Sequence, residues 1–420
     1  MESRGGKLTV LTSDLTSEKP KDKTKDPKNI VTYSAWNLFR NCARAYYHRY
    51  IKEIVPKETS EQIRLGKSIH KCLEIWHTNL SDLTPPERAQ KLFCYIDNQF
   101  PHRLQYLEDG TPNPFYSQSD KVTWMKSRAM MDGYINRYPA EDFEVIACEE
   151  KFNLEISNPK TSAVSKSFRL RGKRDLDVVN NDQKIFIMEH KTAASIDDEY
   201  LMKLPMDTQI LLYEYAAEMC YGKPIDGIIY NVIETTKIQP RKGETEEEFQ
   251  IRYAEACAKN KSGKSNVSRN FPETDEQFQA RLAEKYNNPD STAYHREVIL
   301  VSNDLRRVLR ENLWHFTQTL LFTKRGGFWP QNNSYCFNFH RPCDYYNLCR
   351  NMDNPEILKE FYTSVKAHVE LEDDENNSES NKPQEIEETQ ETKQQQALQI
   401  LNNATGKPIK DVANELLKIS

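Results

Sequence analysis

The fold is decided by two stretches that lie close together in the sequence, Gly172-Lys173-Arg174-Asp175-Leu176-Asp177 and Ile185-Phe186-Ile187-Met188-Glu189-His190-Lys191-Thr192. Both patterns indicate β-strands, and the Asn- and Asp-containing segment 180–183 between them predicts a turn. Asp175 lies directly opposite Glu189 only if Asn180 pairs with Lys184, which leaves a three-residue loop. A four-residue loop would turn Glu189 to the other face. Three-residue hairpin loops are common, so we predict this register.

Such a hairpin would supply the groups that phosphodiester hydrolysis requires. Carboxylates are the ligands that Mg²⁺ prefers in proteins, and a bound cation polarises a phosphate and lowers the pKa of its water. Lys191 follows Glu189 by two residues and therefore shares its face of the strand. Its ammonium group can orient the water or stabilise developing charge. An Asp, thirteen residues, then Glu-x-Lys also occurs by chance at polar strand ends, so the neighbouring motifs must decide.

Three further motifs flank the hairpin: an opening helix with a cysteine, a Gly-x-x-x-His helix and a Gln-x-x-x-Tyr helix. They are Tyr33-Ser34-Ala35-Trp36-Asn37-Leu38-Phe39-Arg40-Asn41-Cys42, Gly66-Lys67-Ser68-Ile69-His70 and Gln209-Ile210-Leu211-Leu212-Tyr213. Together with Gly172-x-x-Asp175 and Glu189-x-Lys191-Thr192, this ordered series resembles the PD-(D/E)XK nuclease superfamily. Within it, the chain is most similar to RecB-like exonucleases of the phage and CRISPR-associated type. The resemblance covers roughly residues 33–350.

The resemblance implies an α/β fold. It has a restriction-endonuclease-like core, in which a central mixed sheet is flanked by helices, with a helical N-terminal region and a C-terminal cysteine segment. We expect helices at 35–50, 63–79, 86–99, 121–138 and 208–221, β-structure at 143–191 and 227–235, and a strand then a long helix within 298–322. The three strands within 143–191 should form one sheet, flanked by the helices at 63–79 and 208–221.

The resemblance also assigns roles. It places Asp175, Glu189, Lys191, Gln209 and Tyr213 in catalysis, and His70, Asp175 and Glu189 at a divalent metal. From spacing alone, His70, Glu74 and His77 share one helical face, which is either a ligand face or a polar solvent stripe. The resemblance selects His70 and leaves the other two on the surface.

Two points remain open. Gln209 and Tyr213 are also i, i+4 neighbours that could be buried for structural reasons alone, since tyrosine often buries its ring and bonds through its hydroxyl. Glu149 fits the family's strand glutamate better than Glu150, but its role is unresolved.

The cysteines suggest a second metal centre. Cys336, Cys343 and Cys349 fall within fourteen residues, and the resemblance adds Cys42 from the opening helix. Four thiolates suit an iron–sulfur cluster or zinc. The resemblance to iron–sulfur nucleases favours a 4Fe–4S cluster. Their usual spacing, however, is Cys-x2-Cys-x5-Cys, and it would place the first ligand at His340. We favour Cys336, because thiolates dominate iron–sulfur ligation, and keep a Cys3His zinc site as the alternative.

The alternative interpretation of the same cysteines is that they are buried apolar residues without a metal. The charged residues Arg341 and Asp344, together with Pro342, lie beside them and argue against a plain core segment. We expect the remaining five cysteines to be core residues: Cys72, Cys94, Cys148, Cys220 and Cys257. We find neither a signal peptide nor an apolar stretch that could span a membrane, so we expect a cytoplasmic protein (in the host cytoplasm if it is viral) without disulfides.

The chain divides into three parts. Residues 1–30 are polar and Lys-rich, which predicts a disordered N-terminal segment. Residues 31–369 form the RecB-like PD-(D/E)XK nuclease domain, with a helical insertion at 240–290. Residues 370–420 form an acidic disordered tail, which ends in a candidate short helix and could dock a protein partner.

The insertion contains a duplication. Segment 244–252 matches segment 273–281, and each copy has a capping box that should start a helix. The basic segment 259–269 between the copies is a candidate for DNA contact. Its Lys-Ser-Gly-Lys-Ser run mimics a phosphate loop, but Ala258 stands where that motif requires glycine, which excludes an ATPase of this type.

The sequence therefore predicts a metal-dependent DNA exonuclease that uses Mg²⁺ or Mn²⁺. It would act on DNA with a free or single-stranded end, in recombination, repair or phage DNA processing. The alternative is a catalytically inactive nucleic-acid-binding or scaffold protein on the same fold, although such relatives usually lose the Asp, the Glu or the Lys. A zinc-binding structural protein would leave these residues without a role. The net charge of −5 does not oppose DNA binding, because segment 370–396 holds ten acids and two lysines.

Overall fold

The computed structural model describes residues 29–58, 60–78, 82–107, 109–260, 264–338 and 341–371. The predictions for segments 1–30 and 370–420 lie almost entirely outside the described residues, and so does His340. Within the described ranges, every helix is too short or too polar to cross a membrane.

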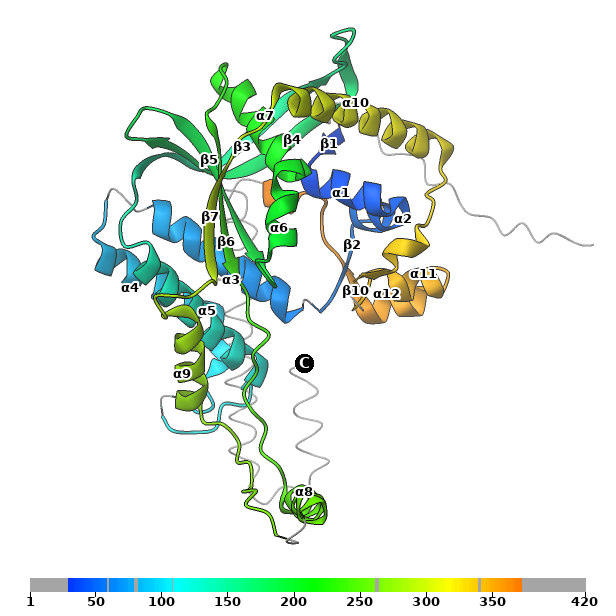
Figure 1. The fold of residues 1–420 in the computed structure, drawn as a ribbon. Coiled ribbons are helices and arrows are strands. Elements are labelled where there is room, and N and C mark those ends of the chain that lie inside the picture. Colours follow the sequence, from blue (N-terminus) through cyan, green and yellow to red (C-terminus); the bar gives the residue numbers. More distant parts are fainter. Residues whose placement is uncertain are drawn as a thin grey trace, which may run out of the picture.

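A six-stranded mixed sheet forms the centre of the molecule (Figure 1). Its strands run in the order β1-β4-β5-β6-β7, and β3 also pairs with β4. The β1–β4 and β5–β6 pairs are parallel, and the others are antiparallel. The strands are β1 (Asn29–Val31), β3 (Phe143–Ser157), β4 (Val164–Asn180), β5 (Ile185–Ala193), β6 (Gly227–Glu234) and β7 (Tyr294–Ile299). The central mixed sheet confirms the predicted fold class.

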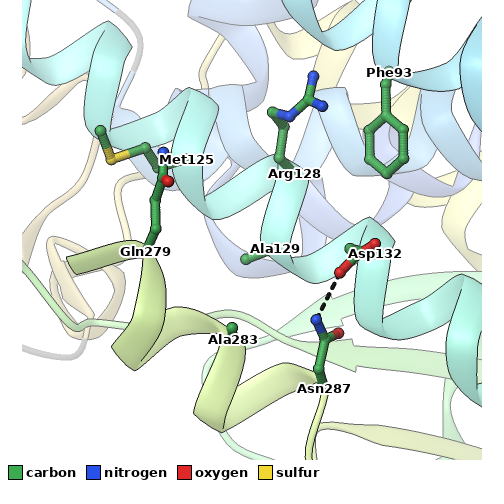
Figure 2. Close-up of a pocket in the computed structure, with 8 residues that line it drawn as sticks. All are labelled: Phe93, Met125, Arg128, Ala129, Asp132, Gln279, Ala283 and Asn287. Atoms are coloured by element: carbon green, nitrogen blue, oxygen red, sulfur yellow. Dashed lines mark hydrogen bonds between the residues drawn. The ribbon is translucent and has the colours of Figure 1, made fainter. Parts of the chain in front are cut away.

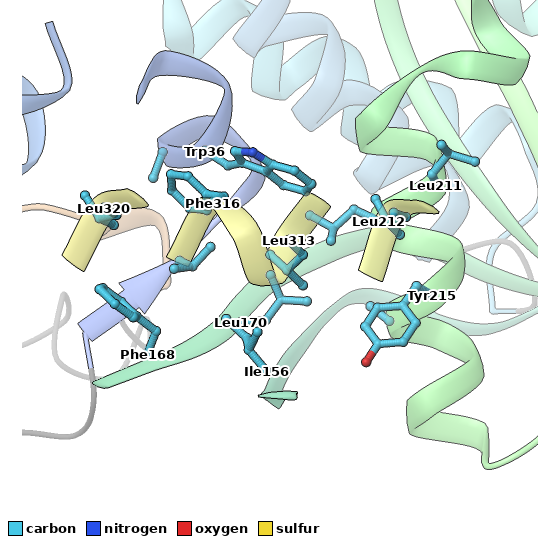
Figure 3. Close-up of a cluster of buried hydrophobic side chains, with 14 of the residues drawn as sticks. Trp36, Ile156, Phe168, Leu170, Leu211, Leu212, Tyr215, Leu313, Phe316 and Leu320 are labelled. Atoms are coloured by element: carbon cyan, nitrogen blue, oxygen red, sulfur yellow. The ribbon is translucent and has the colours of Figure 1, made fainter. Parts of the chain in front are cut away.

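Helices pack on the sheet in two groups, each with its own apolar core. The main helices are α3 (Glu61–Thr78), α4 (Pro85–Gln99), α5 (Gln118–Arg137), α6 (Asp198–Lys203), α7 (Thr208–Tyr221) and α10 (Asn303–Gly326). One core joins α3, α4 and α5. The other joins α7 and α10 to β3 and β4, with Trp36 stacked on Phe316 at 5.7 Å between ring centroids (Figure 3). Both α3 and α7 contact β3 and β5, so the predicted flanking helices are confirmed.

The alternation of side chains along the strands sorts residues between these two groups of helices. On β6, Tyr230 and Val232 belong to a cluster with α7, whereas Ile233 packs with α3 and α5. On β5, Glu189 pairs with Tyr230 and therefore faces α7, whereas the next residue, His190, faces the side of α3 and α5. One strand therefore supplies polar groups to both faces of the sheet.

The two ends of the described chain meet. The predicted helix at 35–50 is interrupted: α1 (Tyr33–Asn41) stops at Cys42, which is extended, and α2 (Ala43–Tyr46) and a π-helical turn (Tyr47–Ile51) follow. The C-terminal elements are β8 (Phe337–Asn338), β9 (Arg341–Pro342), α11 (Tyr346–Arg350), α12 (Pro355–Phe361) and β10 (Tyr362–Ser364). Strand β10 pairs with β2 (Ile54–Pro56), which ties this segment to the N-terminal helices. Short 3-10 turns cover Pro101–Arg103, Leu204–Met206, Asn333–Tyr335 and Val369–Leu371.

The insertion forms a long arm that carries α8 (Glu246–Lys259) at its tip, and α9 (Asp275–Tyr286) returns to the body (Figure 1). Both helices begin with the predicted capping boxes, which confirms this part of the prediction. Helix α9 buries Phe278, Leu282 and Tyr286, and it packs on α5. Helix α8 buries no residue. Backbone hydrogen bonds of 3.0 Å connect the two legs, from Glu244 to Asn270 and from Glu273 to Arg241.

Candidate active site

The hairpin of β4 and β5 has the predicted register. The backbone N–H of Asn180 donates to the carbonyl of Lys184 at 3.0 Å and closes the three-residue loop. Strand pairing then continues in register up to the residues next to Asp175 and Glu189. These two acids therefore follow at matching positions of neighbouring strands, as the turn sequence predicted.

Asp175 receives two contacts on one carboxylate oxygen. His70 of α3 contacts Oδ2 through Nε2 at 3.1 Å, and the backbone N–H of His190 donates to the same oxygen at 2.8 Å. Helix α3 approaches closely because Gly66 lies against β5, where an added Cβ would be 3.2 Å from Thr192 Oγ1. One helical turn later, His70 reaches the acid. Burial alone would raise the pKa of Asp175, but the charge and hydrogen bond of His70 lower it.

Glu149 is a further acid at this point. The β3–β4 register puts it opposite Asp175, and His70, Glu149 and Asp175 each offer a ligand atom within 4.8 Å of the other two. Glu149 has a φ of 57°, a conformation that costs about 1–3 kcal/mol in a non-glycine residue. It forms an ion pair with Lys173, yet burial raises its pKa. The strand glutamate whose role the sequence left open therefore lies within the site.

Glu189 lies beside these groups with one oxygen unused. Lys191 Nζ and Gln209 Nε2 both donate to its Oε1, the latter at 2.9 Å. Its Oε2 is buried and has no hydrogen-bond partner among the described residues. Burial, followed by the charge of Asp175, raises the pKa of Glu189 to about 7 against the effect of Lys191. A divalent cation would give Oε2 a partner and relieve the repulsion between the two acids.

Tyr213 lies one turn after Gln209 on α7. Burial and then the nearby Glu189 raise its pKa, and its ring meets the edge of the Phe152 ring at 6.1 Å between centroids. The Phe152 ring in turn covers Gly172, where an added Cβ would be 2.4 Å from a ring carbon. This close packing explains the glycine of the Gly-x-x-Asp motif.

The structure thus brings all the predicted nuclease residues into one neighbourhood: His70, Asp175, Glu189, Lys191, Gln209 and Tyr213. Asp177 does not join them. It is fully buried and holds Arg174 through two hydrogen bonds of 2.9 and 2.6 Å. The catalytic roles of the six residues remain predictions.

The chain is similar to known proteins. Residues 30–350 match the family described as the PD-(D/E)XK nuclease superfamily. The chain belongs to this superfamily. A crystal structure of a candidate exonuclease from Eubacterium rectale is also similar to this nuclease, with 12% sequence identity, a TM-score of 0.34, and coverage of 76% of this chain and 91% of that chain. No curated protein matches the sequence.

The cysteines of the nuclease gather where the two chain ends meet. Cys42, Cys343 and Cys349 belong to one cluster with Tyr345, and the backbone N–H of Cys343 donates to the carbonyl of Cys336 at 2.9 Å. The backbone N–H of Tyr345 donates to Cys343 Sγ at 3.3 Å. Burial raises the pKa of the Cys343 thiol to about 11. Cys42 of the N-terminal helices therefore lies in the same region as the three cysteines of the C-terminal segment.

A cavity of about 320 Å³ lies apart from the acids, between α5 and α9 (Figure 2). Its lining includes Phe93, Met125 and Arg128, and Asn287 donates to Asp132 at 2.6 Å across it. None of the predicted site residues lines this cavity.

Some predictions about individual residues were wrong. His77 is buried rather than on the surface, and its Nε2 lies 3.3 Å from Glu141. Cys94 and Cys220 are exposed and Cys148 and Cys257 are only partly buried, so Cys72 alone of the five predicted core cysteines is buried. Sequence reasoning also missed Asn231, which is fully buried in β6 next to the active strand. A single amide side chain in the otherwise apolar strand Gly-Ile-Ile-Tyr-Asn-Val-Ile could have indicated this buried polar residue.

Proposed function

We propose that this nuclease is a Mg²⁺- or Mn²⁺-dependent DNA exonuclease of the RecB-like type, acting in recombination, repair or phage DNA processing. The observation that carries the proposal is the joint arrangement of four groups. His70, Glu149 and Asp175 offer ligand atoms within 4.8 Å of one another, and the buried Glu189 beside them has an unpaired oxygen among the described residues. We further propose that residues 31–369 act as one nuclease unit with the arm inserted.

We assign the cation to His70, Asp175 and Glu189, with Glu149 as a further ligand. One imidazole and several carboxylates suit a hard divalent cation, and the strained backbone of Glu149 is the kind of feature found at functional sites. When bound, the cation would polarise the scissile phosphate and lower the pKa of the attacking water. Without a cation, the negative charges of these carboxylates would repel one another in the buried site.

Lys191 would act as a charged donor rather than as a base. Burial lowers the pKa of its ammonium group, but Glu189 and then Asp175 raise it above its ordinary value. The group therefore stays protonated, where it can hold the water or stabilise charge on the phosphate. Gln209 holds the same oxygen of Glu189 as Lys191 does, which fixes the carboxylate between them. Tyr213 packs behind this arrangement.

The choice of an exonuclease, and of DNA with a free or single-stranded end, rests on the motif series shared with RecB-like exonucleases. The presence of Asp175, Glu189 and Lys191 supports an active enzyme over an inactive scaffold on the same fold.

We also propose that Cys42, Cys336, Cys343 and Cys349 hold a 4Fe–4S cluster that supports the fold. The resemblance to iron–sulfur nucleases supports this cluster over zinc, because thiolates dominate iron–sulfur ligation. A Cys3His zinc site remains the alternative.

One experiment tests the nuclease assignment. Linear end-labelled single-stranded and double-stranded DNA, and closed circular DNA, are incubated with the protein and Mg²⁺ or Mn²⁺. An exonuclease shortens the labelled linear strands progressively and leaves the closed circles intact. Cleavage of the circles would establish an endonuclease instead. Binding of DNA without any cleavage, with either metal, would support the inactive alternative.

A further inference from the structure

A line of polar side chains, of which His190 and Asn231 are buried, crosses the sheet from the candidate site. His190 of β5 pairs with Asn231 of β6, and Asn231 pairs with Arg296 of β7, so the three residues are direct neighbours on adjacent strands. Asn231 Nδ2 lies 2.8 Å from His190 Nδ1, and Arg296 Nε donates to Asn231 Oδ1 at 3.0 Å. Both His190 and Asn231 are buried.

The far end of the line is anchored in the helical layer. Arg296 donates to both carboxylate oxygens of Glu141, at 2.5 and 2.8 Å, and to the hydroxyl of Tyr134 at 2.6 Å. His77 of α3 lies 3.3 Å from the same Glu141. The guanidinium group also covers the Tyr138 ring at 3.7 Å from its centroid. Arg296 therefore has little freedom to move.

The direction of each hydrogen bond follows from the arginine. Its Nε can only donate, so Asn231 Oδ1 is the acceptor and Nδ2 is the donor. His190 Nδ1 must then accept, which fixes the ring position and leaves the hydrogen on Nε2. That Nε2 is buried and has no partner among the described residues. An unpaired buried donor costs free energy, so stability alone does not account for a histidine here.

The near end of the line is Asp175. The backbone N–H of His190 donates to Asp175 Oδ2, so the position of His190 sets the orientation of that carboxylate. We propose that His190, Asn231 and Arg296 are positioning residues, which hold β5 so that Asp175 is oriented for its cation. The proposal rests on the proposed metal site at Asp175. Groups behind a metal ligand typically change metal affinity or activity by about 10–100-fold when they are lost.

The test measures Mn²⁺ binding by the full chain without substrate, by electron paramagnetic resonance, alongside the Mn²⁺ concentration that gives half-maximal DNA cleavage. Asn231→Leu has a similar size but breaks the hydrogen bonds of Asn231 to His190, Arg296 and Tyr134, and we expect about 10–100-fold weaker Mn²⁺ binding. Asn231→Asp still accepts from Arg296 and can accept from a His190 that carries its hydrogen on Nδ1. We therefore expect it to restore most of the affinity.

Ile228→Ala is the matched control, because it truncates a buried side chain of the same strand that packs on the opposite face of the sheet from Asn231. It should lower the melting temperature and leave Mn²⁺ affinity unchanged. The proposal is overturned if folded Asn231→Leu binds Mn²⁺ like the wild type, or if Ile228→Ala loses as much affinity. If Asn231→Leu does not fold, Asn231→Ser is used for the same comparison, and unchanged Mn²⁺ binding by that variant also overturns the proposal. A wild-type protein that binds no Mn²⁺ would instead overturn the metal site itself.

Discussion

Removing the ammonium group of Lys191 should slow DNA cleavage by two to three orders of magnitude. A unit charge about 4 Å from a phosphate oxygen, at an effective dielectric constant near 20, contributes about 4 kcal/mol. The Lys191 side chain is 29% exposed, so solvent screening reduces this value. Loss of a single well-placed donor typically costs about 10²–10³ in kcat. The two arguments agree, and Lys191→Ala is the direct test.

The assay follows single-turnover cleavage of end-labelled DNA at saturating Mn²⁺. DNA binding is measured separately by fluorescence anisotropy with Ca²⁺ in place of Mn²⁺. We expect Lys191→Ala to bind DNA within a few fold of the wild type, because the change removes a single charge. Lys203→Ala is the matched control, since Lys203 is 70% exposed and pairs only with Glu199 in the described structure. It should cleave at the wild-type rate.

A rate for Lys191→Ala within tenfold of the wild type would refute this reasoning, because chemistry would then proceed without the charge. Equal losses of DNA binding and cleavage would also count against it, since they would make Lys191 a binding residue only.

Three further predictions follow from other parts of the structure. Protein purified without oxygen should be brown, and replacing any one of the four proposed cluster cysteines with serine should lower its melting temperature, whereas a colourless protein with one zinc would favour the Cys3His site. Gly172→Ala should lower the free energy of unfolding by about 1–3 kcal/mol, because the added methyl group overpacks against the Phe152 ring. Adding Phe152→Leu to this variant should recover part of the loss, as measured by urea unfolding. A loss below about 0.5 kcal/mol, the scatter of surface substitutions, would contradict the close contact. Burial would raise the pKa of Glu141, but Arg296 and His77 lower it. The stability that this carboxylate provides should therefore be complete above its ordinary pKa and should disappear as the pH falls through the lowered pKa. Glu141→Gln should reduce the change in melting temperature between pH 6 and pH 3, and an unchanged pH profile would show that the carboxylate contributes nothing.

The sequence predicted the hairpin because turn chemistry and strand alternation are local. Asn180 and the loop length fix the register, and the register fixes which side chains of β4 and β5 lie opposite each other. The motif series added His70, whose approach depends on a glycine that the structure explains by the contact with Thr192. These features follow from short spacings in the chain.

Other features depend on residues far apart in the sequence. Glu149 enters the site through a left-handed backbone conformation, which residue type does not predict for a glutamate. The line from His190 to Arg296 joins three strands and two helices, and only the strand order reveals it. Cys42 interrupts the expected helix because its backbone is extended, with φ at −161°.

The two legs of the arm are joined by backbone hydrogen bonds, so the structure of the body does not depend on the tip. Gly243 lies directly against Pro272, and the hydrogen bonds from Glu244 to Asn270 and from Glu273 to Arg241 join the two legs just before α8 begins. The free energy of closing a loop changes only slowly with its length, so replacing the tip by a shorter turn changes this cost little. The segment from 246 to 268 can therefore be exchanged for a short turn, or for a reporter domain, without moving β6 or α9. That makes the arm a natural place to engineer this nuclease.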